Sequence, residues 1–461
     1  MAFLQRQMNR GSVSTGYDID NSLKVEVDNS EWIYRSSPSA GNRRTFTISL
    51  WLKRACLGHV PAGGDEYLAG QGSNARFHFA GDTLRFMFDG NSTELEASGK
   101  LRDTSAWYHI VLAVDTTQGT NTNRVKAYVN GESYPFNNSD WPSQNAQSDW
   151  MNTQNLYIGS RYPGDGDNDL AGYISEVVVL DGTQASPTDF GEYDEDSGIW
   201  KPIDVSDLTF GSEGFYYKFD DASDLGKDSS GNGNDATLNN IAAANQATDT
   251  PTNNFCTWNP LWTFSKPRTI SEGGTNADGS SSWGGVKGTI GVTNGKWYWE
   301  NKASGTDTII GWQTDNCVAE SNEESMHNVK DTIGFYTGYD YVYIRDETSG
   351  RNDTSTTGSN VSGQIIGMAL DLDSSPQTAT FYRNGSAVSS AINIDGLTGK
   401  TLFPFMSQYN YNAESNFGGY TSFSISSAAS DANGYGTFEY APPSGYYAIC
   451  GKNLAEFGGS A

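Results

Sequence analysis

Hydrophobic and polar residues alternate with a period of two along most of the chain, in short runs separated by Gly, Asn, Asp and Ser. In residues 45–53 (TFTISLWLK), Phe46, Ile48, Leu50 and Leu52 fall on one side of an extended strand. This pattern predicts a half-buried strand of an antiparallel sheet. Because similar runs recur from residue 23 almost to the end, we expect an all-β protein.

One helix start stands out from this pattern. In the segment SPTDFGEY, Ser186 is a suitable N-cap and Pro187 suits the first helical position. We therefore expect one or two helical turns there.

Two segments share the same order of strand, loop and strand. Tyr108–Asp115 is followed by a Thr/Gly/Asn loop and Arg124–Gly131, and Gln364–Asp373 is followed by Ser-Ser-Pro and Thr378–Gly385. Each pair is predicted as a long hairpin closing on Asn-Gly, which tolerates the positive φ of a tight turn. One such hairpin in each half favours two antiparallel β-sandwiches of related construction. Two unrelated hairpins are the alternative.

The length of 461 residues also favours more than one domain. Turn-forming residues dominate between Gly226 and Asn259, so we expect the boundary and some relative motion there. The expected parts are an N-terminal arm (1–20), a first jelly roll (21–245), a linker (246–258), a second sandwich (259–450) and a C-terminal tail (451–461).

The charge narrows the possible partners. With 55 acidic and 29 basic residues the net charge is −26, which disfavours nucleic acid and anionic membrane surfaces. No apolar run approaches the roughly 18 residues of a membrane-spanning helix, and no signal peptide is recognisable, so we expect no membrane insertion. Four widely spaced cysteines predict free, mostly buried thiols made in a reducing cytoplasm, with one long-range disulfide as the alternative: Cys56, Cys256, Cys317 and Cys450.

The motifs resemble known families. In residues 21–245, the segments NSLKVEVDNSEWIYR, WYHIVLAVDT, KAYVNG, LYIGSR and AGYISEVVVLDG resemble a laminin G-like or concanavalin A-like jelly roll. In residues 259–450, the segments GKWYWEN, IIGWQ, DTIGFY, IIGMALDLD, FYRNG, LFPFMS, NFGG and APPSGYYAI are similar to a SPRY domain. The pairing, and the opening RQMNRGSVSTGYDIDNSL, resemble adhesin-like structural proteins of tailed bacteriophages, particularly marine ones.

This resemblance implies a virion-surface protein made in the host cytoplasm, such as a tail fibre, spike or head appendage. It would bind a host-surface glycan or another envelope component, dock on other virion proteins through its N-terminal arm and form a homo-trimer. A purely architectural capsid decoration protein is an alternative.

A catalytic alternative depends on one motif. Residues 26–31 (EVDNSE) fit the E-x-D-x-x-E pattern of jelly-roll endoglycanases, with Glu26 and Asp28 as nucleophile and helper and Glu31 as acid. Asn29 and Ser30 break the strand, so an edge strand with solvated acids is the expected structure. No G-x-S-x-G is present, and none of the four histidines has a recognisable nucleophile nearby, so we expect no enzyme.

Calcium is the candidate cofactor. Residues 164–170 (GDGDNDL) place Asp165, Asp167 and Asp169 at alternate positions, and oxygen ligands of this kind suit a hard cation. A plain acidic turn is the alternative.

Aromatic residues in turn-rich loops are the candidate ligand-binding residues. A flat ring can pack against the C–H face of a sugar while nearby Asn, Asp and Gln bond its hydroxyls. The candidates are Trp141, Trp150, Trp283, Tyr339, Tyr341, Tyr343, Tyr409 and Tyr411.

Overall fold

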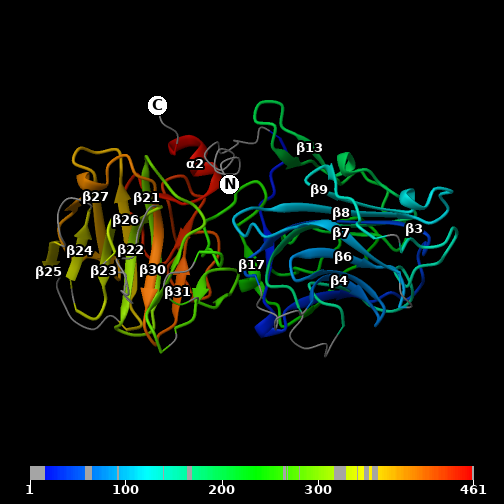
Figure 1. The fold of residues 1–461 in the computed structure, drawn as a ribbon, viewed down its shortest axis with the longest axis horizontal. Helices are drawn as coiled ribbons and strands as arrows, with labels where there is room; N and C mark the ends of the chain where they lie inside the picture. Colours follow the sequence, from blue (N-terminus) through cyan, green and yellow to red (C-terminus); the bar gives the residue numbers. More distant parts are fainter. Residues whose placement is uncertain are drawn as a thin grey trace. The chain divides into compact units, whose positions relative to one another are not determined.

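The computed structural model describes residues 16–57, 65–90, 93–138, 140–162, 169–262, 266, 268–279, 281–315, 329–339, 341–346, 352–355 and 362–458. The protein is nearly all β, with 41% strand and 6% helix, and the sheets in these residues are antiparallel apart from one short parallel pairing of Trp297–Tyr298 with Tyr447–Ala448. It divides into two units, one covering Ser14–Thr252 and the other including Asn253–Ala461 (Figure 1). We call them the N-terminal and the C-terminal unit. The predicted fold class of two β-sandwiches is confirmed.

The N-terminal unit contains two large sheets. The first has the order β10 (Glu132–Ser133), β9 (Val125–Val129), β8 (Tyr108–Asp115), β3 (Thr45–Arg54), β12 (Gly172–Asp181), β1 (Ser22–Val25) and β17 (Gln246–Ala247), with β15 (Phe215–Tyr217) also paired to β12. The second has the order β16 (Thr237–Asn239), β2 (Trp32–Arg35), β11 (Leu156–Ile158), β4 (Asp65–Gln71), β5 (Ala75–Ala80), β6 (Thr83–Met87) and β7 (Glu94–Lys100).

The two sheets enclose one apolar core. Ile48 and Leu50 of β3 and Phe77 and Phe79 of β5 belong to the same buried cluster. Each of these side chains contributes about 1.5–3 kcal/mol by leaving water. The apolar positions of the alternating sequence pattern therefore face inward, into the space between the two sheets.

The outer face of β3 differs from the prediction. Every residue of the strand after Thr45 is buried, so the expected half-buried strand is wrong. The cause is an excursion over residues 183–210, which places Ala185, Phe190 and Val205 against Val178 on the outside of the first sheet. The residues of β3 alone could not indicate that this distant segment would cover the outer face of the strand.

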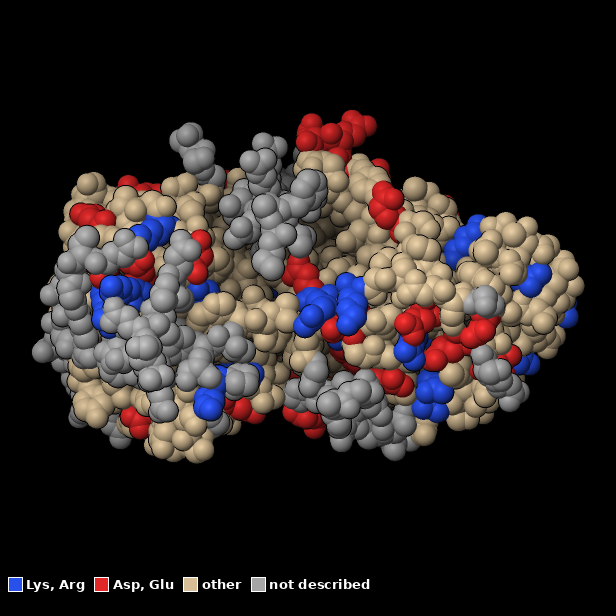
Figure 2. All heavy atoms as spheres, viewed as in Figure 1, with Lys and Arg blue, Asp and Glu red and all other residues tan. Residues whose placement is uncertain are grey.

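The excursion contains the predicted helix start. Ser186 precedes the 3-10 helix η3 (Pro187–Asp189), and its backbone N–H donates to the Asp189 carboxylate at 2.8 Å. The hairpin of β13 (Gly191–Tyr193) and β14 (Trp200–Pro202) follows. Its acidic side chains project at the top of Figure 2, and Glu195 is exposed. The remaining 3-10 helices of this unit are η1 (Val27–Asn29), η2 (Asn121–Asn123) and η4 (Ala243–Asn245).

The C-terminal unit also has two large sheets. The first has the order β18 (Ile270–Ser271), β19 (Asn276–Ala277), β31 (Ala413–Asn416), β21 (Lys296–Ala303), β26 (Ile365–Asp371), β27 (Thr378–Arg383) and β28 (Ser386–Ala387), and includes β29 (Ile392–Asn393) and β34 (Tyr447–Ala448). The second has the order β20 (Gly284–Lys287), β30 (Leu402–Gln408), β22 (Thr308–Thr314), β23 (Thr332–Tyr336), β24 (Tyr341–Arg345) and β25 (Asn352–Ser355). The smaller elements are β32 (Ala429–Ser430), β33 (Thr437–Phe438), η6 (Asp395–Leu397) and α2 (Gly451–Phe457).

Aromatic rings fill the space between these two sheets. Trp299 of β21 meets Trp312 of β22 edge to face, with ring centroids 6.4 Å apart. Phe335 of β23 contacts Phe381 of β27 with centroids 6.1 Å apart and planes tilted by 38°. Such pairs add about 0.5–1.5 kcal/mol beyond the burial of their area.

The two predicted hairpins are present, but Asn-Gly has a different place in them. β8 pairs with β9 and β26 with β27, and the two strands of each pair are joined at their other ends. Asn130-Gly131 and Asn384-Gly385 instead make the next turns, into β10 and β28, with positive φ at both residues. Each Asn side chain accepts a backbone N–H from the neighbouring strand, at 2.7 Å and 3.0 Å. The two halves thus share this local construction.

The segment expected as a linker is packed on both sides of the unit boundary. Gln246–Ala247 form β17 in the N-terminal unit, and Asp249 is 1% exposed. After the boundary, Phe255 and Trp258 are buried in the C-terminal unit. The expected tail likewise begins with helix α2, whose Phe457 stacks on Tyr447 at 3.9 Å.

Two expectations concern single features. Among the described helices, none has the length and apolar character needed to cross a membrane. Cys56, Cys256 and Cys450 are free and buried, as predicted, whereas Cys317 lies outside the described residues.

A buried ion pair links Lys53 of β3 to Asp249, near the end of the N-terminal unit. Lys53 Nζ donates to Asp249 Oδ2 at 2.6 Å, and Trp107 Nε1 donates to Asp249 Oδ1 at 2.9 Å. The Lys53 and Asp249 side chains are 0% and 1% exposed. Removing one partner of such a pair leaves an uncompensated buried charge, which costs far more than losing the attraction itself.

We therefore expect Asp249→Asn to lower the free energy of unfolding of the N-terminal unit by roughly 3 kcal/mol or more. Urea denaturation followed by Trp fluorescence measures this change. The matched control is Asp220→Asn, which breaks a 3.4 Å pair with Lys218 whose side chains are 34% and 47% exposed. The control should cost less than about 1 kcal/mol. If both substitutions lowered the free energy of unfolding equally, the buried Lys53–Asp249 pair would not have the role assigned to it.

Candidate functional site

Two of the candidate aromatic residues are in the cores. Trp150 is 0% exposed, stacks on Phe86 with centroids 5.8 Å apart and donates its Nε1–H to the Met87 carbonyl at 2.9 Å. Tyr343 is also 0% exposed and belongs to a core cluster of the C-terminal unit. Their prediction as exposed loop rings is wrong, because Trp150 packs into the core of the N-terminal unit and Tyr343 lies within strand β24, where its side chain is buried.

Two further candidates are half-buried and stand apart. Trp141 packs edge to face on Phe136 at 5.8 Å, beside the core of the N-terminal unit. Tyr411 lies over Gly305, where an added Cβ would come within 2.1 Å of its ring. Neither ring is a member of the group of rings described next.

The other four candidates meet in one group of rings in the C-terminal unit. Tyr409 contacts Trp283 at 6.0 Å, Trp283 contacts Tyr336 at 5.9 Å, and Tyr336 contacts Tyr339 at 4.8 Å and Tyr341 at 5.7 Å. We call these five residues the aromatic row. Tyr336 is buried at its centre, Trp283, Tyr341 and Tyr409 are half-buried, and Tyr339 is 67% exposed.

The sheet topology explains why these residues meet. Trp283 immediately precedes β20, Tyr409 follows β30, Tyr336 ends β23 and Tyr341 begins β24. The register pairs Gly284 with Gln408 and Tyr336 with Tyr341. In antiparallel strands such starts and ends lie at the same end of the sheet.

Polar groups hold the row in place. The Tyr336 hydroxyl donates to the Asp307 carboxylate at 3.4 Å, and the Tyr409 N–H donates to the Asp307 carbonyl at 2.9 Å. Arg268 donates to the carbonyls of Ser282 and Gln408, both at 2.6 Å, and so fixes the residues before Trp283 and Tyr409. Burial, with Asp307 nearby, raises the pKa of Tyr336, so its phenol stays protonated and remains a donor.

The row thus offers flat rings beside a hydrogen-bonding carboxylate, which is the chemistry that suits a saccharide. Sequence reasoning missed Tyr336 and Asp307. Tyr336 follows Ile333 and Phe335 in an apolar strand and so resembles a core residue, and Asp307 has no distinctive sequence context.

The calcium hypothesis stays a prediction. Asp165 and Asp167 lie outside the described residues, and Asp169 is 5% exposed and forms a β-bridge with Tyr67. Within the part of the chain that the structure describes, no group of three or more His, Cys, Asp or Glu residues is arranged to hold a metal.

The acidic motif does not form the arrangement of a jelly-roll glycanase. Glu26 is 0% exposed, Asp28 is exposed on the 3-10 helix η1, and Glu31 makes a 2.9 Å ion pair with Lys24. Glu26 and Asp28 therefore do not share a strand face, as the nucleophile and helper would require.

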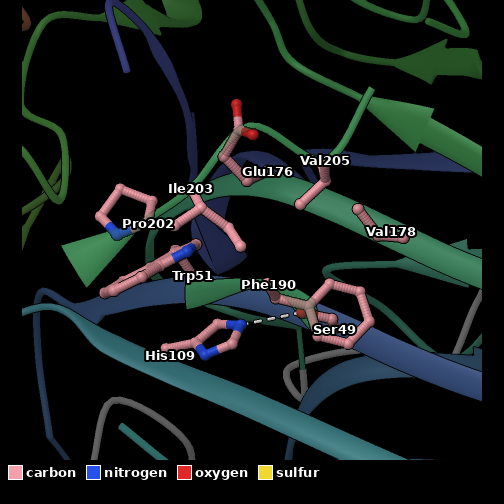
Figure 3. Close-up of a pocket in the computed structure, with 9 residues that line it drawn as sticks. All are labelled: Ser49, Trp51, His109, Glu176, Val178, Phe190, Pro202, Ile203 and Val205. Atoms are coloured by element: carbon pink, nitrogen blue, oxygen red, sulfur yellow. Dashed lines mark hydrogen bonds between the residues drawn. The ribbon is translucent and has the colours of Figure 1, made fainter. Parts of the chain in front are cut away.

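A small pocket between the first sheet and the 183–210 excursion contains Ser49, His109 and Glu176 (Figure 3). Ser49 Oγ lies 2.9 Å from His109 Nε2, and the indole N–H of Trp200 donates to His109 Nδ1 at 3.0 Å. Because an indole can only donate, Nδ1 carries no proton in the neutral ring, and Nε2–H must donate to Ser49. A catalytic base would need the opposite arrangement. Burial lowers the pKa of His109 to about 3, which keeps the ring neutral.

Glu176 of the same pocket has an unusual environment. It sits at a bulge of β12 with φ 49°, is 5% exposed and points away from His109 in Figure 3. The Tyr216 hydroxyl donates to its carboxylate, and the Tyr17 hydroxyl does so at 3.3 Å. Burial raises the pKa of Glu176 from its ordinary value of 4.5 to about 7, although both tyrosines and Lys218 act in the opposite direction.

This shift predicts a pH-dependent stability. A carboxyl whose pKa is higher in the folded state favours folding while it is protonated, and this contribution is lost as the pH rises through about 7. We expect the N-terminal unit to lose stability between pH 5 and pH 8, and Glu176→Gln to remove most of that loss. Thermal unfolding at both pH values measures it. Glu192→Gln, at an exposed position on β13, should keep the wild-type pH dependence. If the Glu176→Gln variant kept the wild-type pH dependence of stability, Glu176 would not be the cause of that dependence.

Comparison with known protein families finds one match in each half of the chain. Residues 28–186 match a family model described as the concanavalin A-like lectin/glucanases superfamily, and residues 296–420 match the model of the SPRY domain. No curated protein matches the chain.

Solved structures similar to parts of the chain include three from different organisms. The SPRY domain of human HERC1 is 19% identical, with 34% of this chain and 96% of that chain covered and a TM-score of 0.28. A putative carbohydrate-binding protein from Bacteroides ovatus is 18% identical, with 48% and 59% covered and a TM-score of 0.36. A heptameric pentraxin from Limulus polyphemus is 14% identical, with 37% and 80% covered and a TM-score of 0.28.

The family matches agree with the resemblance of the sequence motifs and fall one in each unit. The chain therefore contains a concanavalin A-like domain, matched over residues 28–186, followed by a SPRY domain, matched over residues 296–420.

Proposed function

We propose that this chain is a non-enzymatic adhesion protein that binds a host-surface glycan through the aromatic row of its SPRY domain. The observation that supports the proposal is the meeting of Trp283, Tyr339, Tyr341 and Tyr409 at one end of one sheet. Tyr339 keeps 67% of its surface exposed although it could contribute more to stability if it were buried. Because Tyr339 is largely exposed and three neighbouring rings are only half-buried, the row favours a binding role over a pure packing role.

The chemistry of the row favours a saccharide. Tyr and Trp rings give a large, rigid contact area at a low cost in conformational entropy. The Asp307 carboxylate can accept hydrogen bonds from hydroxyl groups, and it lies beside the rings that would contact the C–H faces of a sugar. Other components of a host envelope are the alternative ligands.

The same proposal places the protein on the surface of a tailed-phage particle, as a tail fibre, spike or head appendage. Its support is the resemblance of the opening sequence and of the domain pair to adhesin-like virion proteins. In this role the arm of residues 1–20 docks on other virion proteins, and three copies assemble. Immunogold labelling of particles tests the location, and sedimentation of the full chain tests the trimer.

A glycan array with the soluble full chain tests the binding role. We expect at least one surface glycan to be bound, and Tyr339→Ala to weaken that binding roughly three- to tenfold, because one ring contact contributes about 0.5–1.5 kcal/mol. Tyr193→Ala is the matched control, since Tyr193 is another exposed ring, 45% exposed, on the concanavalin A-like domain.

Binding that both substitutions leave unchanged would contradict the assignment of the site. New reducing ends released from the bound glycan would contradict the non-enzymatic role and favour a glycan-degrading enzyme.

A further inference from the structure

The aromatic row contains two pairs of rings. Trp283 and Tyr409 have centroids 6.0 Å apart and planes inclined by 37°, and Tyr339 and Tyr341 have centroids 6.4 Å apart and planes inclined by 39°. Tyr336 lies between the pairs, at 84° to Trp283 and 59° to Tyr339. The row is therefore two moderately tilted ring pairs joined by a steeply turned, buried ring.

The strand order separates the two pairs along the end of the sheet. Trp283 and Tyr409 belong to the ends of β20 and β30, whereas Tyr339 and Tyr341 belong to the β23–β24 connection. β22 lies between β30 and β23. Because neighbouring strands are about 4.8 Å apart, the two pairs are separated by roughly 10 Å. A pyranose ring is about as large as one phenol ring, so one sugar cannot contact both pairs.

The charge between the pairs is negative. Asp307 immediately precedes β22 and accepts the Tyr336 hydroxyl, so its carboxylate lies at the middle of the row. The whole chain carries a net charge of −26. An acidic saccharide would meet repulsion at the site and on approach, whereas the hydroxyls of a neutral one can donate to Asp307.

The rings are also held before a ligand arrives. Tyr336 contacts a ring of each pair, and Arg268 fixes the backbone beside Trp283 and Tyr409. A ligand that touches both pairs therefore needs little rearrangement of the protein, and its second contact adds to the first at a small entropic cost.

We propose that the aromatic row binds an internal stretch of a neutral polysaccharide, long enough to contact both ring pairs, rather than a single terminal sugar. The inference rests on the proposed glycan-binding function of the same site. It assigns the Trp283/Tyr409 pair and the Tyr339/Tyr341 pair to separate sugar residues of one chain, with Asp307 accepting hydroxyl hydrogen bonds between them.

Calorimetric titration of the full chain with cello-, malto- and laminari-oligosaccharides of two and six residues tests the proposal. We expect a neutral hexamer to bind at least about tenfold more tightly than the dimer of its series, because only the hexamer reaches both pairs. Tyr339→Ala and Trp283→Leu should each remove most of that advantage, and Tyr193→Ala should remove none. Tyr409→Leu replaces Trp283→Leu if the latter lowers the melting temperature of the SPRY domain.

The acidic comparison uses hexagalacturonate, which we expect to bind more weakly than the preferred neutral hexamer. Asp307→Asn should narrow this difference because it removes the repelling charge.

The possible failures are distinct. Equal affinity for the dimer and the hexamer, with only one ring pair sensitive to substitution, would make the row a terminal-sugar site and overturn this inference alone. Preference for hexagalacturonate would also overturn the inference while leaving glycan binding intact. Absence of any binding that the row substitutions weaken, here and on the glycan array, would overturn both the inference and the proposed function.

Discussion

Antiparallel pairing brings the start of one strand and the end of the next to the same end of a sheet, and the candidate site depends on this constraint. The five-strand run β20-β30-β22-β23-β24 alternates in direction, so residues before β20, after β30 and between β23 and β24 reach one end. Trp283 and Tyr409 are far apart in sequence, and the Gly284–Gln408 register alone makes them neighbours. The core pairs Trp299–Trp312 and Phe335–Phe381 pack between the two sheets and so help to fix the strand ends that carry the row.

The concanavalin A-like domain is governed by a different constraint, the cost of burying charge. Lys24, Arg35, Lys53 and Arg54 are each less than 5% exposed, and each reaches a carboxylate, on Glu31, Glu213, Asp249 and Glu66 respectively. Burying each pair costs desolvation that the attraction between its partners offsets, so removing one partner would leave an unpaired buried charge. These pairs also explain the domain limit. Asp249 must belong to the same folded unit as Lys53, so the unit continues past residue 245 to Thr252.

Local patterns predicted the elements well and their environment less well. The strand at 45–53 and the capped turn at Ser186 follow from neighbouring residues alone, so the sequence was sufficient for them. The burial of both faces of β3 depends on the distant 183–210 excursion, and the burial of Trp150 depends on Phe86 and Met87. Three of the site aromatics, Trp283, Tyr339 and Tyr409, lie outside the strands as predicted, whereas Tyr341 begins strand β24. That these rings lie together, and that Tyr336 and Asp307 take part in the site, follows only from the order of the strands in the sheet. A local sequence pattern does not contain that order.

The proposed adhesion role would depend on how the contacts of the row add. One ring contact contributes about 0.5–1.5 kcal/mol, so one ring pair alone would hold a single sugar weakly. If two ring pairs contacted one polysaccharide chain, the second contact would be intramolecular, and several copies of the row on one particle would repeat the same gain. In the proposed role, single contacts could then dissociate without releasing the whole particle. A deep, enclosed pocket would give tighter binding to one terminal sugar, but it could not slide or re-engage along a chain. A row of rings at the end of a sheet, with Tyr339 largely exposed and three rings half-buried, has the geometry that the proposed repeated contact would require.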